Sequence, residues 1–546
     1  MIMSRAFAVM AVSVLIATPL FARADPGPVV QTPQGAVEGQ ADGALRIFKG
    51  LPYATPPVGD LRWTAPRPAA DWQGVRNATR FGPSCIQPFP LPKSIYTDVP
   101  ARMSEDCLYL NVWTPSDAKG APVIVWIHGG GFTTDTSSEG IYDGAKLARR
   151  GVVVVSIDYR LGVLGYLAHP ELSTESPRGV SGNYGLLDQI EALRWVKRNI
   201  TAFGGDPANV TIAGESAGGL SVLYLMTSPD AQGLFSKAIA ESAYMVSTPA
   251  LKDAVFGQQS AEMSGAILVA KLGAQHIAAL RLEDGRTLTN YSAALGFAPG
   301  GTVDGKILPK QLVDAFEHGE QAQAPILVGF NSGEIRSLRV LAPHVPASAA
   351  VYESQIRTRY GDLADAYLKL YPSNNLEESI VAATRDALYG WTAERVAIDQ
   401  TGVGQPAYLY LFDHGYPAAD SAGLHGFHAS ELPYVFGAEH LPPLWPKPPA
   451  NAEETQLSDA MVGYWTSFAR TGAPAAAGQP QWPVFGATHA YMAFKAAPRP
   501  AEDLMPGMFA LQEAVVCRRR AEGATPWTWN IGLQSPPIPP QSAGCR

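Results

Sequence analysis

The chain has few cysteines, few charged residues and, beyond its first 24 positions, no long apolar run. Its four cysteines form no C-x-x-C spacing and its histidines no H-E-x-x-H spacing, so neither zinc-binding motif occurs and no metal is expected. Charged residues make up 16% of the 546 positions, too few for a coiled coil or a disordered chain. After residue 24 no stretch reaches 18 apolar residues, so the sequence predicts no membrane insertion.

An excess of basic residues is also lacking. The formal net charge is −8 at pH 7, with 41 Lys+Arg against 49 Asp+Glu. A mildly acidic surface does not favour nucleic acid or an anionic membrane as a partner. The most compact basic cluster, Arg518–Arg520, is interpreted as a solvated surface patch. The sequence indicates no oligomeric state.

The first 24 residues are typical of an export signal. Arg5 precedes the apolar run Ala6–Leu20, and Ala22-Arg23-Ala24 matches the small-x-small cleavage rule. We expect cleavage after Ala24 and a secreted or periplasmic protein, whose formal charge moves from −8 to −10 because two arginines and no acids are removed. No repeat or linker divides residues 25–546, which are predicted to form a single domain.

The four cysteines are Cys85, Cys107, Cys517 and Cys545. In an exported chain, a low and even count indicates two disulfides. Proximity along the chain favours Cys85–Cys107 and Cys517–Cys545, although three pairings are compatible with the sequence. Closing the first loop would contribute roughly 3 kcal/mol through chain entropy.

Short apolar runs alternate with helical patterns over most of the chain. Residues 29–53 alternate apolar and turn residues, as in an antiparallel hairpin. Apolar residues from Tyr184 to Ile200 follow one face of a helix, and residues 250–325 and 340–400 are mostly helical in pattern. The predicted buried strands are Val123–Ile127, Val152–Val155, Val210–Ala213, Ala238–Ala240, Pro325–Val328 and Tyr408–Phe412. This order predicts an α/β fold with a large, mostly parallel central sheet, flanking helices and helical cap insertions.

Polar and glycine-rich segments follow four of these strands. They are His128-Gly129-Gly130-Gly131-Phe132, Gly214-Glu215-Ser216-Ala217-Gly218, a segment that ends at Glu334, and His425-Gly426-Phe427-His428. Ligands of an open α/β sheet bind at the carboxyl ends of its strands, so we expect these segments to lie together.

A serine, an acid and a histidine therefore occur in that order, each beyond a strand. A serine hydroxyl becomes a strong nucleophile only when a neighbouring base takes its proton, and an acid has to orient that base. Glycines on both sides of Ser216 suit a crowded, strained turn between strand and helix. The triple glycine brings bare N–H groups close to a developing oxyanion, where each donor is worth about 3–4 kcal/mol.

The combination of these segments resembles the type-B carboxylesterase (cholinesterase-like) family of the α/β-hydrolase fold. The resemblance runs from about Val29 to Phe436. Besides the segments above, the motifs that carry it are Phe48-Lys-Gly-Leu-Pro-Tyr53, Ser104-Glu-Asp-Cys-Leu-Tyr-Leu-Asn111, Asp158-Tyr-Arg-Leu-Gly162, Gly182-Asn-Tyr-Gly-Leu-Leu-Asp-Gln189 and Phe203-Gly-Gly-Asp-Pro207.

The resemblance implies a role for each matching residue. Ser216 is the nucleophile, His428 the general base and Glu334 the acid; the N–H groups of Gly130, Gly131 and Ala217 form the oxyanion hole, Ser242 hydrogen-bonds the acid, and Cys85–Cys107 is the family's first disulfide. The implied activity is the hydrolysis of small carboxylic esters through an acyl-enzyme, without metal or organic cofactor.

Several positions leave alternatives open. His425 is a second candidate base, and Asp304 and Asp413 are alternative acids. The acid segment, Ser332-Gly-Glu-Ile335, departs from the family's Asp-Glu-Gly. Glu-Ser-Ala replaces the usual Gln-Ser-Gly around Ser242. No tryptophan lies between the first two cysteines, where cholinesterases hold choline by a cation–π contact, so a choline ester is not expected.

Other charged motif residues are assigned structural roles. Glu215, Asp158, Arg160 and Asp206 are interpreted as members of buried ion pairs that fix loops, and His128 is expected to orient the glycine loop. Alternative functions are a lipase, whose apolar lid would lie between Cys85 and Cys107, and a non-catalytic cholinesterase-like binding protein.

Overall fold

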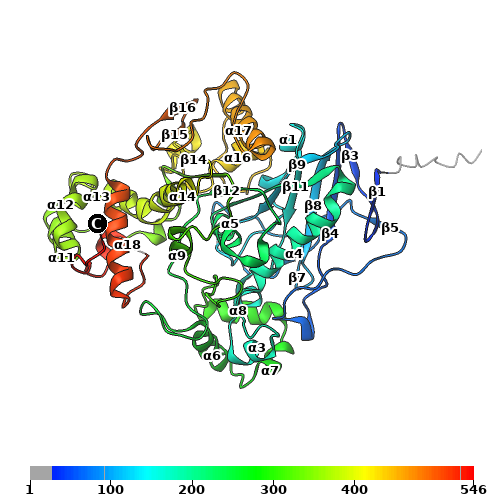
Figure 1. The fold of residues 1–546 in the computed structure, drawn as a ribbon, viewed down its shortest axis with the longest axis horizontal. Helices are drawn as coiled ribbons and strands as arrows, with labels where there is room; N and C mark the ends of the chain where they lie inside the picture. The colour runs from blue at the N-terminus through cyan, green and yellow to red at the C-terminus, as the bar shows by residue number, and fades with distance from the viewer. Residues whose placement is uncertain (1–26, 91–92, 529, 546) are drawn as a thin grey trace, which may run out of the picture.

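The computed structural model describes residues 27–90, 93–528 and 530–545. The predicted signal segment, residues 1–24, lies outside the described residues. An eleven-stranded sheet in the order β16-β15-β14-β13-β12-β11-β9-β10-β8-β4-β3 forms the centre of the molecule (Figure 1). Its parallel strands are β9 (Ala121–Ile127), β10 (Val153–Ile157), β11 (Gly205–Glu215), β12 (Lys237–Glu241), β13 (Ile326–Asn331), β14 (Ala407–Phe412) and β15 (Tyr491–Phe494). The prediction of a large, mostly parallel sheet is confirmed.

Antiparallel strands complete both edges of the sheet. They are β3 (Gln40–Asp42), β4 (Leu45–Pro52) and β8 (Tyr109–Pro115) on one side and β16 (Pro498–Ala501) on the other. Two small sheets flank the first edge, built from β1 (Val29–Thr32), β2 (Gly35–Glu38) and β5 (Val75–Asn77), and from β6 (Ser84–Cys85) and β7 (Met103–Ser104).

Alternate side chains of the central strands enter two separate cores. In β9, Val123, Val125 and Ile127 join the core beneath α4 (Tyr184–Asn199), α5 (Ala217–Thr227), α14 (Trp391–Gly402) and α18 (Met508–Glu522). Ile124 and Trp126 point into the opposite core, which α16 (Leu432–Phe436) and α17 (Ala452–Thr471) cover. Burial on both faces explains why these strands are continuous apolar runs rather than alternating ones.

Two groups of helices extend from the sheet, as the helical patterns predict. One group contains α3 (Pro170–Glu175), α6 (Ala261–Lys271), α7 (Ile277–Arg281) and α8 (Gly285–Ala294), at the bottom of Figure 1. The other contains α11 (Ala349–Tyr360), α12 (Ala364–Leu370) and α13 (Leu376–Arg385), beside the C-terminal helix α18 at the left. In the described segments, every helix falls short of the length and apolar content that spanning a bilayer requires.

Candidate active site

Ser216 occupies the turn between β11 and α5. Its backbone has φ 56° and ψ −119°, a left-handed conformation that is uncommon for a residue with a side chain. Its N–H donates to the Glu241 carbonyl at 3.0 Å. A Cβ on Gly214 or Gly218 would collide with main-chain atoms, so the glycines on both sides are what allow the turn to be this tight.

The predicted acid and base meet at the neighbouring strand ends. Glu334 begins α10 (Glu334–Ser337) after β13, and His428 lies in the loop after β14. The Nδ1 atom of His428 is hydrogen-bonded to Glu334 Oε2. Glu334 Oε1 accepts hydrogen bonds from Ser242 Oγ at 2.7 Å and from the Asn331 N–H at 2.8 Å. The acid is fully buried, and its hydrogen bonds fix the orientation of the ring that it holds.

The other imidazole nitrogen faces a second carboxylate. His428 Nε2 lies 3.0 Å from Glu215 Oε1. Within the described part of the chain, no hydrogen bond joins Nε2 to the Ser216 hydroxyl, although both residues line one cavity. Burial alone would lower the pKa of His428, but the Glu215 and Glu334 carboxylates outweigh burial and raise the pKa to about 9.

Glu215 is therefore a site residue that sequence analysis placed elsewhere. Its side chain is buried, and burial raises the pKa of its carboxyl group well above the ordinary value. It does form a buried pair with a loop residue, as expected, but that residue is His428, the predicted base. The available signal was its position directly before the serine.

The alternative candidates lie outside this arrangement. His425 pairs with Asp413 and Asp420, at 3.2 and 2.9 Å, on the exposed side of its loop. Asp304 accepts a hydrogen bond from Asn183 and from three successive main-chain N–H groups, so it closes a turn. None of these three candidates lines the cavity that contains Ser216.

Two cavities meet beside the serine. Ser216, His428 and Glu215 line one of about 370 Å³, with Tyr96, Tyr142, Tyr389 and Trp445 among its aromatic walls. A second cavity of about 580 Å³ extends toward α6, and Phe132 and Lys271 are among the residues that line it. Gly131 and Tyr244 line both cavities. An ester carbonyl placed at this junction would have room for one group on each side.

The glycine loop approaches Ser216 from the end of β9. Gly130 and Gly131 have φ of 80° and 61° and line the serine cavity, and Ala217 is the first residue of α5. His128 stacks on Tyr159 with ring centroids 4.5 Å apart, and the tyrosine hydroxyl donates to the His128 carbonyl at 2.8 Å. His128 Nδ1 also lies 3.3 Å from the Gly129 carbonyl oxygen, so the imidazole and the Tyr159 hydroxyl both contact the main chain at the start of the glycine loop.

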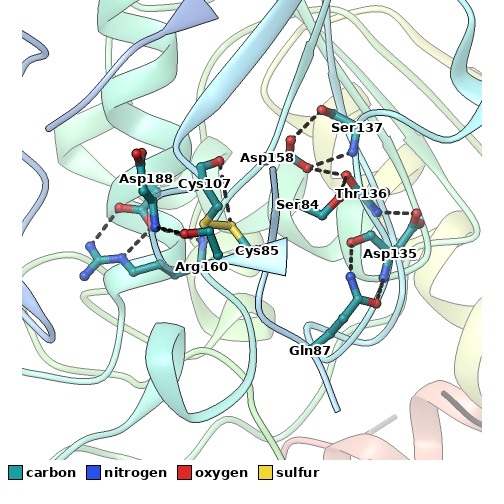
Figure 2. The surroundings of a disulfide bond; sticks show 12 residues. Ser84, Cys85, Gln87, Cys107, Asp135, Thr136, Ser137, Asp158, Arg160 and Asp188 are labelled. Carbon is teal, nitrogen blue, oxygen red and sulfur yellow. Dashed lines mark hydrogen bonds and ion pairs between the residues drawn. A yellow bond between two sulfur atoms is a disulfide. The ribbon is translucent and has the colours of Figure 1, made fainter. Parts of the chain in front are cut away.

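Both disulfides join the pairs that proximity along the chain favours, Cys85–Cys107 and Cys517–Cys545. Figure 2 shows the first disulfide beside a polar network. Gln87 exchanges two hydrogen bonds with the main chain of Asp135, and Ser84 Oγ donates to Thr136 Oγ1 at 2.8 Å. The loop that the disulfide closes is thus fastened at its base to the segment following the glycine loop.

The remaining charged motif residues are structural, with one correction. Arg160 forms a buried ion pair with Asp188 at 2.8 Å, as Figure 2 shows, and Asp158 accepts bonds from Thr136 and Ser137. The prediction that Asp206 belongs to a buried ion pair is wrong. It is half-buried near the start of β11, where the register with β9 shifts, and its side chain accepts the N–H of Ala208 at 2.8 Å.

Comparison with known proteins gives one consistent result. The sequence profile described as "Carboxylesterase family" matches residues 26–507. The chain is 38% identical to a fumonisin B1 esterase of Sphingopyxis macrogoltabida, over 84% of this chain and 85% of that protein. It is 37% identical to the para-nitrobenzyl esterase of Bacillus subtilis, over 84% of this chain and 92% of that protein.

Solved structures agree with the sequence relatives. A carboxylesterase of Geobacillus stearothermophilus superposes with a TM-score of 0.77 at 33% identity, over 88% of this chain and 99% of that one. A para-nitrobenzyl esterase structure gives a TM-score of 0.76 at 35% identity, over 87% of this chain and 97% of that one.

Proposed function

The chain belongs to the carboxylesterase family and hydrolyses carboxylic esters, and we propose that it does so through an acyl-enzyme formed on Ser216. The observation that carries the proposal is the convergence of the strained serine and the Glu334–His428 pair on one cavity. The fold expected from the resemblance, an α/β-hydrolase, is the fold of the structural relatives.

The proposed first step is attack by Ser216 Oγ on the ester carbonyl carbon. His428 Nε2 turns from Glu215 to the hydroxyl and accepts its proton as the new C–O bond forms. Glu334 stabilises the resulting imidazolium and keeps Nδ1 protonated, which leaves Nε2 as the base.

The negative charge that develops on the carbonyl oxygen is assigned to three main-chain donors. The N–H groups of Gly130, Gly131 and Ala217 supply them; the two glycines line the serine cavity, and Ala217 is the first residue of α5. The imidazolium then protonates the departing alcohol. Water, activated by the same histidine, cleaves the acyl-serine and restores the free hydroxyl.

Ser216→Ala tests this mechanism. The variant is expected to lose p-nitrophenyl ester hydrolysis by about 10⁴-fold or more, with an unchanged thermal midpoint, because it lacks the nucleophile. Ser236→Ala, at a half-buried serine before β12, is the matched control and should retain activity. Intact-protein mass spectrometry after fluorophosphonate treatment should show one adduct on wild type and none on Ser216→Ala; full activity of that variant would refute the mechanism.

We also propose export of the protein after removal of residues 1–24. Two disulfides support an oxidising compartment. Amino-terminal sequencing of the protein from its native host should begin at Asp25; a mature chain that begins at Met1 would contradict the proposal.

A further inference from the structure

The loop between Cys85 and Cys107 reaches the catalytic histidine through one tyrosine. The Tyr96 hydroxyl lies 3.0 Å from the His428 carbonyl oxygen, to which it donates, and 2.6 Å from Ser337 Oγ on α10. Its ring meets the imidazole edge to face, with centroids 6.2 Å apart. A single side chain therefore touches the base, the main chain of the base and the helix that begins with the acid.

The histidine loop depends on such contacts because its backbone is strained. His425 and Ala429 have φ of 52° and 65°, unfavourable for residues other than glycine. On the amino-terminal side of His428, Asn331 Nδ2 donates to the Phe427 carbonyl at 2.8 Å. Also on that side, the Gly333 N–H donates to the Gly426 carbonyl at 2.7 Å.

Those two contacts come from the last residue of β13 and from the short turn that leads to α10. The carbonyl of His428 itself is held from across the cavity, by Tyr96. The His428 carbonyl is thus held by the loop between Cys85 and Cys107, which is far in the sequence from both β13 and β14.

We infer that Tyr96 is a positioning residue for ester hydrolysis: its hydroxyl fixes the His428 main chain against α10, so that the disulfide-closed loop sets the position of the base. The inference rests on the proposed function, in which His428 accepts the serine proton. Tyr96 acts through the histidine rather than on the reacting atoms.

The structure supports this role at both ends of the loop and at the hydroxyl. The disulfide and the Gln87–Asp135 bonds anchor the base of the loop that carries Tyr96 (Figure 2). Burial is the main cause that raises the pKa of Tyr96 well above its usual value. The hydroxyl consequently remains a donor throughout the pH range of an esterase assay.

Tyr96→Phe removes the hydroxyl and keeps the ring. We expect kcat to fall about tenfold while KM changes less than about twofold, because small displacements of a catalytic group cost rate rather than binding. The acid limb of the kcat/KM profile should move to lower pH, since an imidazole held less firmly between Glu215 and Glu334 loses part of its raised pKa. A purely structural loss would lower stability without moving that limb.

Tyr464→Phe is the matched control. Its hydroxyl also donates to a main-chain carbonyl, that of Pro480 at 2.5 Å, but it lies on α17 outside both cavities. This variant should leave kcat and the pH profile unchanged. If Tyr96→Phe fails to fold, Ser337→Ala removes the other partner of the hydroxyl and should shift the limb in the same direction.

Fluorophosphonate labelling separates failure of the inference from failure of the proposed function. If wild type acquires no adduct on Ser216, the proposed function fails. If wild type is labelled and Tyr96→Phe is labelled at the same rate, with an unchanged pH profile, the inference is overturned. Labelling of Tyr96→Phe about tenfold more slowly supports it.

Discussion

Replacing Glu215 with glutamine should change the pH dependence of the enzyme more than its activity at neutral pH. The substitution removes one of two carboxylates that hold the His428 imidazole and leaves the acceptor oxygen of an amide at the same place. Because the carboxylate stabilises the imidazolium, its loss affects every state in which the ring carries two protons, including the transition state.

The size of the effect follows from the 3.0 Å separation. Two unit charges at that distance interact by about 5–6 kcal/mol at an effective dielectric constant of about 20. The amide retains an acceptor, so the net loss should be that of a charge-assisted hydrogen bond, about 1.5–3 kcal/mol, or about one to two pKa units. The pKa of His428, about 9 in the wild type, should fall by that amount.

The two enzymes should therefore differ most at alkaline pH. Above pH 9 the free base is neutral and forms the imidazolium only in the transition state, so kcat/KM of Glu215→Gln should be about 10- to 100-fold lower. Near pH 7 the ring of wild type is already protonated before reaction, and the two values should converge. The assay is kcat/KM for p-nitrophenyl acetate between pH 6 and 10.5, corrected for spontaneous hydrolysis.

An equal loss at every pH, or identical profiles, would refute this reasoning. Glu394→Gln is the matched control: Glu394 is also buried, and its Oε1 lies 3.2 Å from His489 Nδ1, but it does not line the serine cavity. Its pH profile should coincide with that of wild type.

Three further predictions concern the support of the site and of the fold. Ser242→Ala should lower kcat about tenfold with little change in KM, because the acid loses a buried 2.7 Å hydrogen bond; steady-state kinetics tests this, and unchanged kcat would contradict it. Cys545→Ser should lower the free energy of unfolding by roughly 3–4 kcal/mol in urea titration, since it opens a loop of 28 residues, and a change below about 1 kcal/mol would oppose the entropic account. Asp188→Asn should lower the free energy of unfolding by about 3–5 kcal/mol in the same titration, because Arg160 would remain buried without its counter-ion. An unaltered urea midpoint would show that the fold does not depend on this ion pair.

The parts of the fold that could be predicted are those marked by patterns within short stretches of sequence, such as apolar runs and flanking glycines. Val210–Ala213 lacks alternation because β11 is buried on both faces, and glycines flank Ser216 because a Cβ at either position would collide with main-chain atoms of the tight turn. The edge strand β16 was not predicted from the sequence. Pro498 and Pro500 are typical of a loop, and they are tolerated there because an edge strand leaves half of its N–H groups unpaired.

The candidate site divides in the same way. Ser216, Glu334 and His428 each follow a strand, so the sheet predicts that they meet. Glu215 and Tyr96 depend on contacts between segments far apart in the sequence. The sequence shows that Glu215 is charged, but the identity of its partner is set by how the loop after β14 folds back.

The order of the strands has a consequence for biosynthesis. The turn bearing Ser216 is built from β11 and α5 and is bonded to the end of β12, whereas the proposed base, His428, lies in the loop after β14. In the proposed mechanism, a nascent chain released before residue 428 would carry Ser216 and the proposed oxyanion amides but lack the base that ester hydrolysis needs. Under the proposed mechanism, ester hydrolysis therefore has to wait until the chain has been made past residue 428 and the loop after β14 has folded against the serine turn.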